Sequence, residues 1–150
     1  MRGIEFKNAV WDLIRLITTG MDLVFRPIVE SYGLTLIQMR ILVGIERGEL
    51  STVGSVGGVV GLSSGNASTM CKKLEKAGFI KRTRDSQDER LVKLVVTELG
   101  SQTIIKIDAM LQEKYSPILE SQSNEDFEQI IAVMKKLNKL LADMGKITNN

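Results

Sequence analysis

The sequence contains no histidine and a single cysteine, Cys71, among its 150 residues. Histidine is the commonest general base and the commonest metal ligand in proteins, so its absence argues against Ser-His triads, the usual zinc sites and histidine proton relays. One cysteine excludes an intramolecular disulfide and suits a reducing compartment. The sequence also offers no other nucleophile–base pair or metal cluster. We therefore expect that the protein is not an enzyme and needs no cofactor.

Long hydrophobic runs and a strong net charge are missing as well. The first twenty residues interrupt their apolar positions with Glu5, Lys7, Asp12 and Arg15, so they lack the core of a secretory signal and of a membrane span. We expect a cytoplasmic protein without a membrane partner. The net charge is only +2 and 43% of the residues are hydrophobic. This composition is typical of a folded protein, and the length predicts one domain over residues 1–150.

Apolar residues recur at helical spacing through the first third of the chain. The pattern predicts a long amphipathic helix from Ile4 to Ser31, which Pro27 kinks or resets, with Gly33 as its C-terminal cap. A second helix is predicted from Thr35 to Gly48. It begins with a capping box, because Gln38 stands three residues after the threonine and can bond back to its backbone.

Two short helices are predicted next, joined at Gly61 and Leu62. The first begins after Ser51 or Thr52 and is rich in glycine, and each glycine costs a helix about 0.8–1 kcal/mol. Whether residues 52–61 are fully helical stays open. The second begins after Ser63, and helical spacing gives it two faces. One face holds Ala67, Met70, Cys71 and Leu74, and the other holds Gly65, Thr69, Lys72 and Lys76.

The second half of the chain predicts a hairpin and two more helices. Residues 79–84 and 91–97 are rich in β-forming side chains and flank a polar stretch, which indicates a β-hairpin. Thr97 begins a fifth helix that Pro117 ends or bends. Ser123 and Asp126 cap a sixth helix, and this helix carries more apolar surface than a solvent-facing terminal helix needs.

This order of elements predicts a mainly α fold, a winged helix-turn-helix with a wing of two to three β-strands. The winged helix-turn-helix is expected over residues 34–97, with the remaining helices in residues 1–33 and 98–146.

Positive charge gathers in one part of the chain. Between residues 62 and 97 there are eight Lys and Arg against four Asp and Glu, a net charge of +4 in a chain whose total is +2. For a single basic helix, a solvated lysine face is the simpler explanation. Here an adjacent helix and hairpin are both basic, which favours binding to a phosphate backbone.

The second short helix suits the major groove, because its first turns carry small and amide side chains. Asn66 and Thr69 are expected to read base edges, and the lysines further along to hold phosphates. Arg90 at the hairpin tip is expected to enter the minor groove, oriented by Asp88. The predicted DNA-binding residues are Ser63, Ser64, Gly65, Asn66, Ser68, Thr69, Lys72, Lys73, Lys76, Arg82, Arg84, Asp88 and Arg90.

The stretches "YGLTLIQMRIL", "LSSGNASTMCKKLEKAGFIKR" and "RDSQDERLVKLVVTELG" resemble the MarR family of transcriptional regulators. Asp88 and Arg90 match the Asp-x-Arg wing motif of that family, and "VTELG" matches the start of its next helix. The resemblance implies that residues 34–97 form a DNA-binding lobe and that residues 1–33 and 98–146 form dimerisation helices. It also implies a homodimer, a palindromic operator in double-stranded DNA, and a small-molecule or redox signal that weakens DNA binding. Glu89 and the glycine-rich helix depart from the family pattern.

We therefore predict a DNA-binding regulator, a repressor that a small aromatic or phenolic effector releases from its operator. The effector pocket is expected near Trp11, Met21 or Met39, where thioethers can adapt to a ligand. Cys71 is expected to pack in the core rather than to sense oxidants. The alternative is a winged-helix module that binds a protein and has weak or lost DNA binding, which the glycine-rich helix and Glu89 favour.

Overall fold

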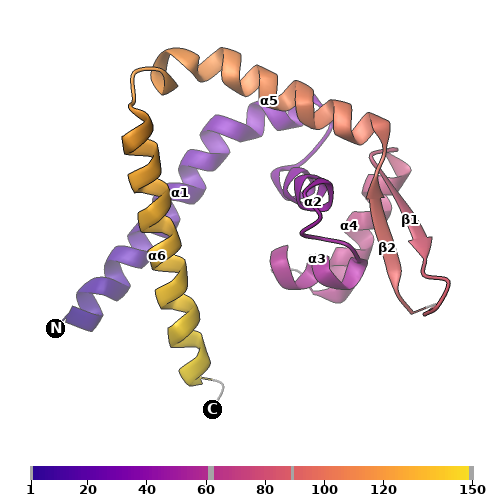
Figure 1. The fold of residues 1–150 in the computed structure, drawn as a ribbon, viewed down its shortest axis with the longest axis horizontal. Helices are drawn as coiled ribbons and strands as arrows, with labels where there is room; N and C mark the ends of the chain where they lie inside the picture. Colours follow the sequence, from indigo (N-terminus) through magenta and orange to yellow (C-terminus); the bar gives the residue numbers. More distant parts are fainter. Residues whose placement is uncertain (1, 61–62, 89, 149–150) are drawn as a thin grey trace. The chain divides into compact units, whose positions relative to one another are not determined.

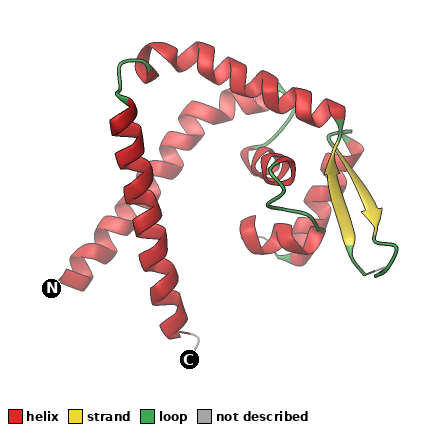
Figure 2. Ribbon diagram, viewed as in Figure 1, coloured by secondary structure: helices red, strands yellow, loops and turns green. Residues whose placement is uncertain are grey.

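The computed structural model describes residues 2–60, 63–88 and 90–148. In the described part the chain forms α1 (Arg2–Ser31), α2 (Leu36–Glu46), α3 (Val53–Val60), α4 (Ser64–Lys76), β1 (Ile80–Arg84), β2 (Val92–Val96), α5 (Glu98–Leu119) and α6 (Asn124–Thr148) (Figure 1). Figure 2 shows that helices make up most of the chain and that the two strands form one hairpin. The predicted mainly α winged helix-turn-helix is confirmed. Two compact units, Met1–Leu111 and Gln112–Asn150, divide the chain, and each is described by itself.

The helices begin where the sequence supplies capping side chains. Thr35 and Gln38 form the predicted capping box, because each side chain accepts a hydrogen bond from the backbone N–H of the other, at 3.2 and 2.8 Å. Thr52 and Ser55 bond in the same reciprocal way at the start of α3, at 3.2 and 3.1 Å. This contact satisfies N–H groups that a helix start leaves free. The glycine-rich segment is α-helical from Val53 to Val60, while the predicted joint at Gly61 and Leu62 lies outside the described residues.

Three helices end at glycines whose φ angles are positive, namely Gly33, Gly48 and Gly78 at 74°, 73° and 82°. Side chains rarely adopt this left-handed conformation, so glycine sets the end of the helix. The two prolines do not end their helices. Pro27 lies inside α1 and Pro117 inside α5, which continues to Leu119. Pro117 was predicted either to end or to bend its helix. The first alternative, that it ends the helix, is wrong.

The core of the first unit lies among α2, α3, α4 and β1. Its largest fully buried side chains include Ile41, Leu42, Leu74 and Ile80, and Ile107 adds one from α5. Burying a side chain of this size stabilises a fold by about 1.5–3 kcal/mol. Cys71 is also fully buried, on the inner face of α4, as the sequence pattern predicted. The buried inner face of α4 packs on this core, and its outer face is exposed to solvent.

Strand β2 of the wing is paired on both of its edges. Strands β1 and β2 pair antiparallel in a register that runs from Ile80 opposite Val96 to Arg84 opposite Val92. On its other edge β2 pairs briefly with the segment before α3, because Leu94 N–H donates to the Ser51 carbonyl at 3.0 Å. The base of the wing is thereby tied to the helix-turn-helix.

Thr97 connects the start of α5 to the end of α4. Its hydroxyl donates to the Gly78 carbonyl at 2.6 Å and accepts from the Gly100 N–H at 3.1 Å. Gly100 packs so closely against this turn that a Cβ atom there would collide with the Phe79 carbonyl oxygen and with Val96. The first turn of α5 thus rests directly on the backbone between α4 and the wing.

Helices α1 and α6 each expose large apolar side chains. On α1 these include Trp11, Leu16 and Leu23, and on α6 they include Ile130 and Met134, all at least half exposed. Among the described residues, none of the helices has by itself the length and hydropathy of a membrane span, although α1 and α2 pass that test as a pair bent by 78°. Helices α1 and α6 therefore each carry a set of exposed apolar side chains.

Replacing Gly100 with alanine is expected to destabilise the first unit by about 1–3 kcal/mol, since the added methyl group overpacks a backbone contact. Gly58→Ala is the matched control, because a Cβ at Gly58 meets no atom within 4 Å. The control should raise stability by about 0.8–1 kcal/mol through better helix propensity. Chemical denaturation of both variants measures this, and equal stability of the two would contradict the packing described here.

Candidate nucleic-acid interface

The outer face of α4 carries the polar residues that were predicted to approach DNA. Ser63 caps the helix and accepts a hydrogen bond from Asn66 N–H at 3.4 Å. Gly65, Asn66 and Thr69 are exposed and Ser68 is partly buried, while the side chain of Ser64 lies outside the described part of the chain. A Cβ at Gly65 would meet nothing within 4 Å. The first two turns of α4 therefore present short side chains to solvent.

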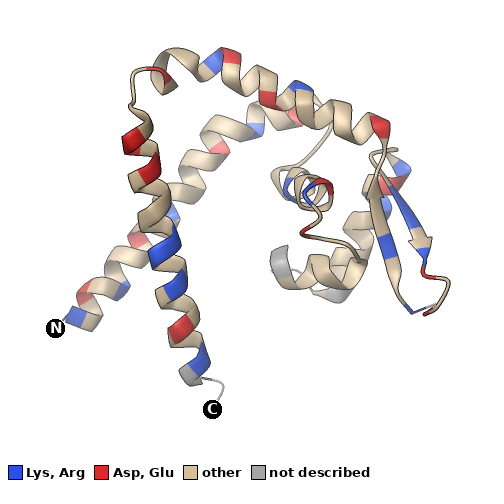
Figure 3. Cartoon of the chain, viewed as in Figure 1, with Lys and Arg blue, Asp and Glu red and all other residues tan. Residues whose placement is uncertain are grey.

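The second half of α4 is basic. Lys72, Lys73 and Lys76 are all exposed, and two of them lie in the last turn. Cations at this end are stabilised by the helix dipole. Figure 3 shows further basic positions on both strands of the wing. The α4 lysines continue the exposed face that Asn66 and Thr69 begin, so this helix combines polar and cationic side chains on one side.

An ion pair joins α4 to the wing. The Arg82 guanidinium on β1 lies 3.5 Å from the Glu75 carboxylate on α4. The other oxygen of the same carboxylate accepts the Arg82 backbone N–H at 3.1 Å. Only 18% of the Arg82 side chain is exposed. Arg82 stays a predicted DNA contact, but its observed partner is Glu75, and this link holds β1 in a fixed position against α4.

The tip of the wing presents Arg84, Asp88 and Arg90 to solvent. The Asp88 carboxylate accepts the backbone N–H of Arg90 at 3.0 Å. We predicted that Asp88 orients the Arg90 side chain, whereas this hydrogen bond holds the main chain of Arg90. Glu89 lies outside the described residues.

Two cations of the wing, Lys81 and Lys93, are not among the predicted DNA-binding residues. Lys81 is an exposed cation on β1, which the alternation of strand side chains could have shown. Lys93 on β2 bonds to Asp85 at 2.5 Å. This bond, with the backbone N–H groups of Gln87 and Asp88, lowers the pKa of Asp85 to about 2. The Lys93–Asp85 ion pair depends on the register of the hairpin. The residue types alone do not predict that register.

Arg82 pairs with Glu75 and Lys93 pairs with Asp85. The other basic side chains of α4 and the wing are available to bind phosphates. Within the described ranges, no ion pair engages the remaining cations between residues 72 and 93. These six are Lys72, Lys73, Lys76, Lys81, Arg84 and Arg90. We call them, together with the exposed first turns of α4, the basic face.

Cys71 lies behind the basic face rather than on it. Burial raises the pKa of its thiol, and the nearby Arg82 charge opposes that rise only in part. A buried thiol that stays protonated is a poor nucleophile. This geometry agrees with the packing role that the sequence predicted.

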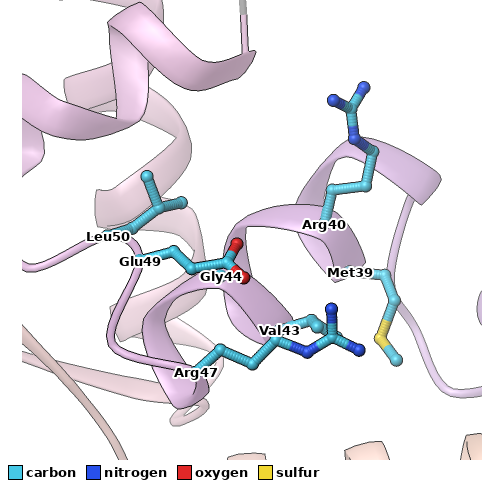
Figure 4. A pocket seen from close by; sticks show the side chains of 7 residues that line it. All are labelled: Met39, Arg40, Val43, Gly44, Arg47, Glu49 and Leu50. Carbon is cyan, nitrogen blue, oxygen red and sulfur yellow. The ribbon is translucent and has the colours of Figure 1, made fainter. Parts of the chain in front are cut away.

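The three predicted effector residues do not share one site. Met39 lines a hollow of about 280 Å³ on the outer face of α2, together with Val43, Leu50, Gly44 and the charged side chains of Arg40, Arg47 and Glu49 (Figure 4). Trp11 and Met21 lie on α1, exposed by 67% and 41%, and do not line this hollow. In the part of the chain that the structure describes, no group of three or more acidic or cysteine side chains is placed to hold a metal ion.

Known proteins with similar sequences and folds are transcriptional regulators. The family described as "Transcriptional regulator SarA/Rot" matches residues 23–107. The organic hydroperoxide resistance transcriptional regulator of Bacillus subtilis is 28% identical over 144 residues, which cover 92% of each chain.

Solved structures share the fold. A MarR family protein from Bacillus stearothermophilus superposes with a TM-score of 0.72 at 22% identity, over 92% of this chain and 96% of that one. The S. aureus MepR–DNA complex gives a TM-score of 0.69 at 21% identity, over 86% and 95% of the chains. The family match covers more than half of the sequence. The chain therefore belongs to the SarA/Rot family of transcriptional regulators, and it shares the winged-helix fold of the MarR family protein from Bacillus stearothermophilus.

Proposed function

We propose that the protein represses transcription by binding a palindromic operator as a homodimer, and that a small-molecule effector releases it. One observation carries the DNA-binding part of this proposal. The exposed face of α4 and the basic wing are joined by the Glu75–Arg82 ion pair, so that polar and cationic side chains from both elements act as one surface. A protein that binds chromosomal DNA in this way would act in the cytoplasm.

The basic face divides into a part that reads sequence and a part that supplies affinity. Asn66 can form two hydrogen bonds with an adenine edge, and the short side chains around it allow the helix to approach the floor of the major groove. Lys72, Lys73 and Lys76 would contact phosphates, which position the helix without reading bases. Arg90 at the tip would enter the neighbouring minor groove, where the negative potential is strongest when the groove is narrow.

A second copy of the chain is the proposed partner for the apolar surfaces of α1 and α6. Exposed apolar patches of this extent are rare on monomers and mark interaction surfaces. A symmetric dimer would present two basic faces to one duplex, with half-sites about one turn, or ~34 Å, apart. A palindromic operator follows from that symmetry. Occupation of such a site next to a promoter would block transcription.

The hollow on α2 supports the proposed effector. Its apolar lining by Met39 and Val43 suits an aromatic ring, and the guanidinium groups of Arg40 and Arg47 suit an acidic or phenolic oxygen. In Figure 4 the Arg47 side chain extends along α2 toward Met39. A ligand there would contact α2, which packs against both α1 and α3. Its binding could therefore shift the position of the helix-turn-helix.

Arg90→Ala is expected to weaken binding to a 30-bp duplex and to flatten its salt dependence. Each phosphate charge that a bound cation neutralises contributes about 0.9 to the slope of log K against log salt, so losing the Arg90 charge from the minor groove should reduce the slope by about that amount for each protomer. Fluorescence anisotropy across a potassium chloride series measures both effects.

Lys136→Ala, which removes the same charge from an exposed position on α6, is the control and should leave affinity and slope unchanged. Absence of wild-type binding at low salt would contradict the proposal and favour a winged-helix module that binds a protein instead.

Met134→Glu is expected to dissociate the homodimer, because it places a charge on the apolar face of α6, where Met134 is 55% exposed in the single chain. Burying an unpaired carboxylate at an interface is costly. Sedimentation velocity should show a dimer for the wild type and a monomer for the variant. Lys135→Glu, one residue along on the polar face, should remain dimeric. A monomeric wild type at micromolar concentration would refute the dimer.

A further inference from the structure

The side chain of Asp85, the first residue after β1, organises the whole turn of the wing. One carboxylate oxygen accepts the backbone N–H of Gln87 at 2.7 Å and that of Asp88 at 3.2 Å. The other oxygen bonds to the Lys93 ammonium at 2.5 Å. The Asp85 backbone N–H also donates to the Leu91 carbonyl at 2.9 Å. One residue therefore connects the end of β1, the turn and the start of β2.

Only an aspartate satisfies these contacts together. A carboxylate accepts on both oxygens and its charge strengthens each bond. An asparagine would offer one accepting oxygen and would turn N–H donors toward either the turn or Lys93. A glutamate is longer and does not fit the short loop back to the second and third following N–H groups, which is the geometry of an Asx turn. The Asp85 side chain is 13% exposed and the Lys93 side chain is 57% exposed, so the ammonium group of the pair remains in contact with water.

The same contacts divide the cations of the wing into two kinds. Lys93 is held by Asp85, whereas Arg84 and Arg90 have no ion pair with any residue that the structure describes. Arg84 immediately precedes Asp85, and Arg90 follows the turn that Asp85 closes. Asp85 therefore fixes the main chain between these two arginines, while its bond to Lys93 holds that ammonium group at the turn.

We propose that Asp85 is a positioning residue for DNA binding: it fixes the wing turn so that Arg84 and Arg90 reach the duplex, and it withdraws Lys93 from phosphate contact. This inference rests on the proposed function. Lys93 and Asp85, which bond to each other, should therefore differ in their effect on DNA binding. Loss of Lys93 should leave DNA binding unchanged, although Lys93 is a cation on the wing. Loss of Asp85 should impair the use of Arg90, although Asp85 is an anion.

A mutant cycle in the Lys93→Met background tests this proposal, because that background removes the lysine that Asp85→Asn would otherwise free. The probe is a 30-bp duplex of fixed sequence at fixed salt. Lys93→Met alone should match the wild type in affinity and salt slope. In that background Arg90→Ala should weaken binding about tenfold. After Asp85→Asn is added, Arg90→Ala should weaken DNA binding less than about twofold, because the turn no longer holds Arg90 in position to reach the duplex.

The outcomes separate the two proposals. A tenfold effect of Arg90→Ala that persists after Asp85→Asn would overturn the positioning role, as would a drop of about 0.9 in salt slope on Lys93→Met. A loss from Asp85→Asn greater than that from Arg84→Ala and Arg90→Ala combined would show a general structural role and would also overturn it. If the wild type binds no duplex at low salt, the proposed function fails first, before any variant is compared.

The contacts themselves have an independent signature in the titration of Asp85. Its pKa is lowered to about 2, chiefly by the bond to Lys93 and then by the two N–H donors. Because the folded pKa lies below the unfolded value near 3.9, the network stabilises the wing above about pH 4 and loses this contribution as pH falls through about 2. Carbon-detected NMR should find the low pKa in the wild type and a higher one in Lys93→Met. An ordinary pKa in the wild type would refute the network.

Discussion

The carboxylate of Glu75 holds the wing against α4, and the proposed interface depends on that contact. It accepts the backbone N–H of Arg82 and pairs with the same residue's guanidinium. Without it, the helix that would read bases and the hairpin that would grip the next groove could move separately. The left-handed turn at Gly78 makes the contact possible, because it reverses the chain within a few residues of the helix end. Thr97 then anchors α5 to that turn through the Gly78 carbonyl.

The charges of the lobe follow from this arrangement. Acidic residues within a basic surface look unfavourable for binding DNA, yet Glu75 and Asp85 each hold a cation and a backbone N–H group. Exposed ion pairs stabilise proteins little, so their main effect here is geometric. They fix the strands and the turn, and the lysines and arginines that remain unpaired among the described residues supply the attraction to phosphates. The net charge of the whole chain, only +2, conceals this division.

Local patterns in the sequence predicted the elements of the fold well. The capping pair of Thr35 and Gln38, the reciprocal contact of Ser123 and Asp126, and the two faces of α4 all depend on residues three or four positions apart. The partner of Arg82 could not be predicted, because it depends on how the chain turns at Gly78 and on which face of β1 meets α4. Of the three residues named for an effector pocket, Met39 lines the hollow on α2, whereas Trp11 and Met21 do not. Trp11 and Met21 resemble Met39 in chemistry, but tertiary packing, which no local pattern encodes, leaves them on the exposed surface of α1.

Dimethyl sulfate footprinting on a genomic fragment selected by the purified protein tests most directly whether α4 and the wing act as one DNA-binding surface, because the reagent methylates guanine N7 in the major groove and adenine N3 in the minor groove. We expect two equivalent protected segments related by a dyad, each combining a major-groove contact with protection of the adjoining minor groove, and separated by about one helical turn. Protection confined to one groove, or a selected fragment without a dyad, would contradict the account.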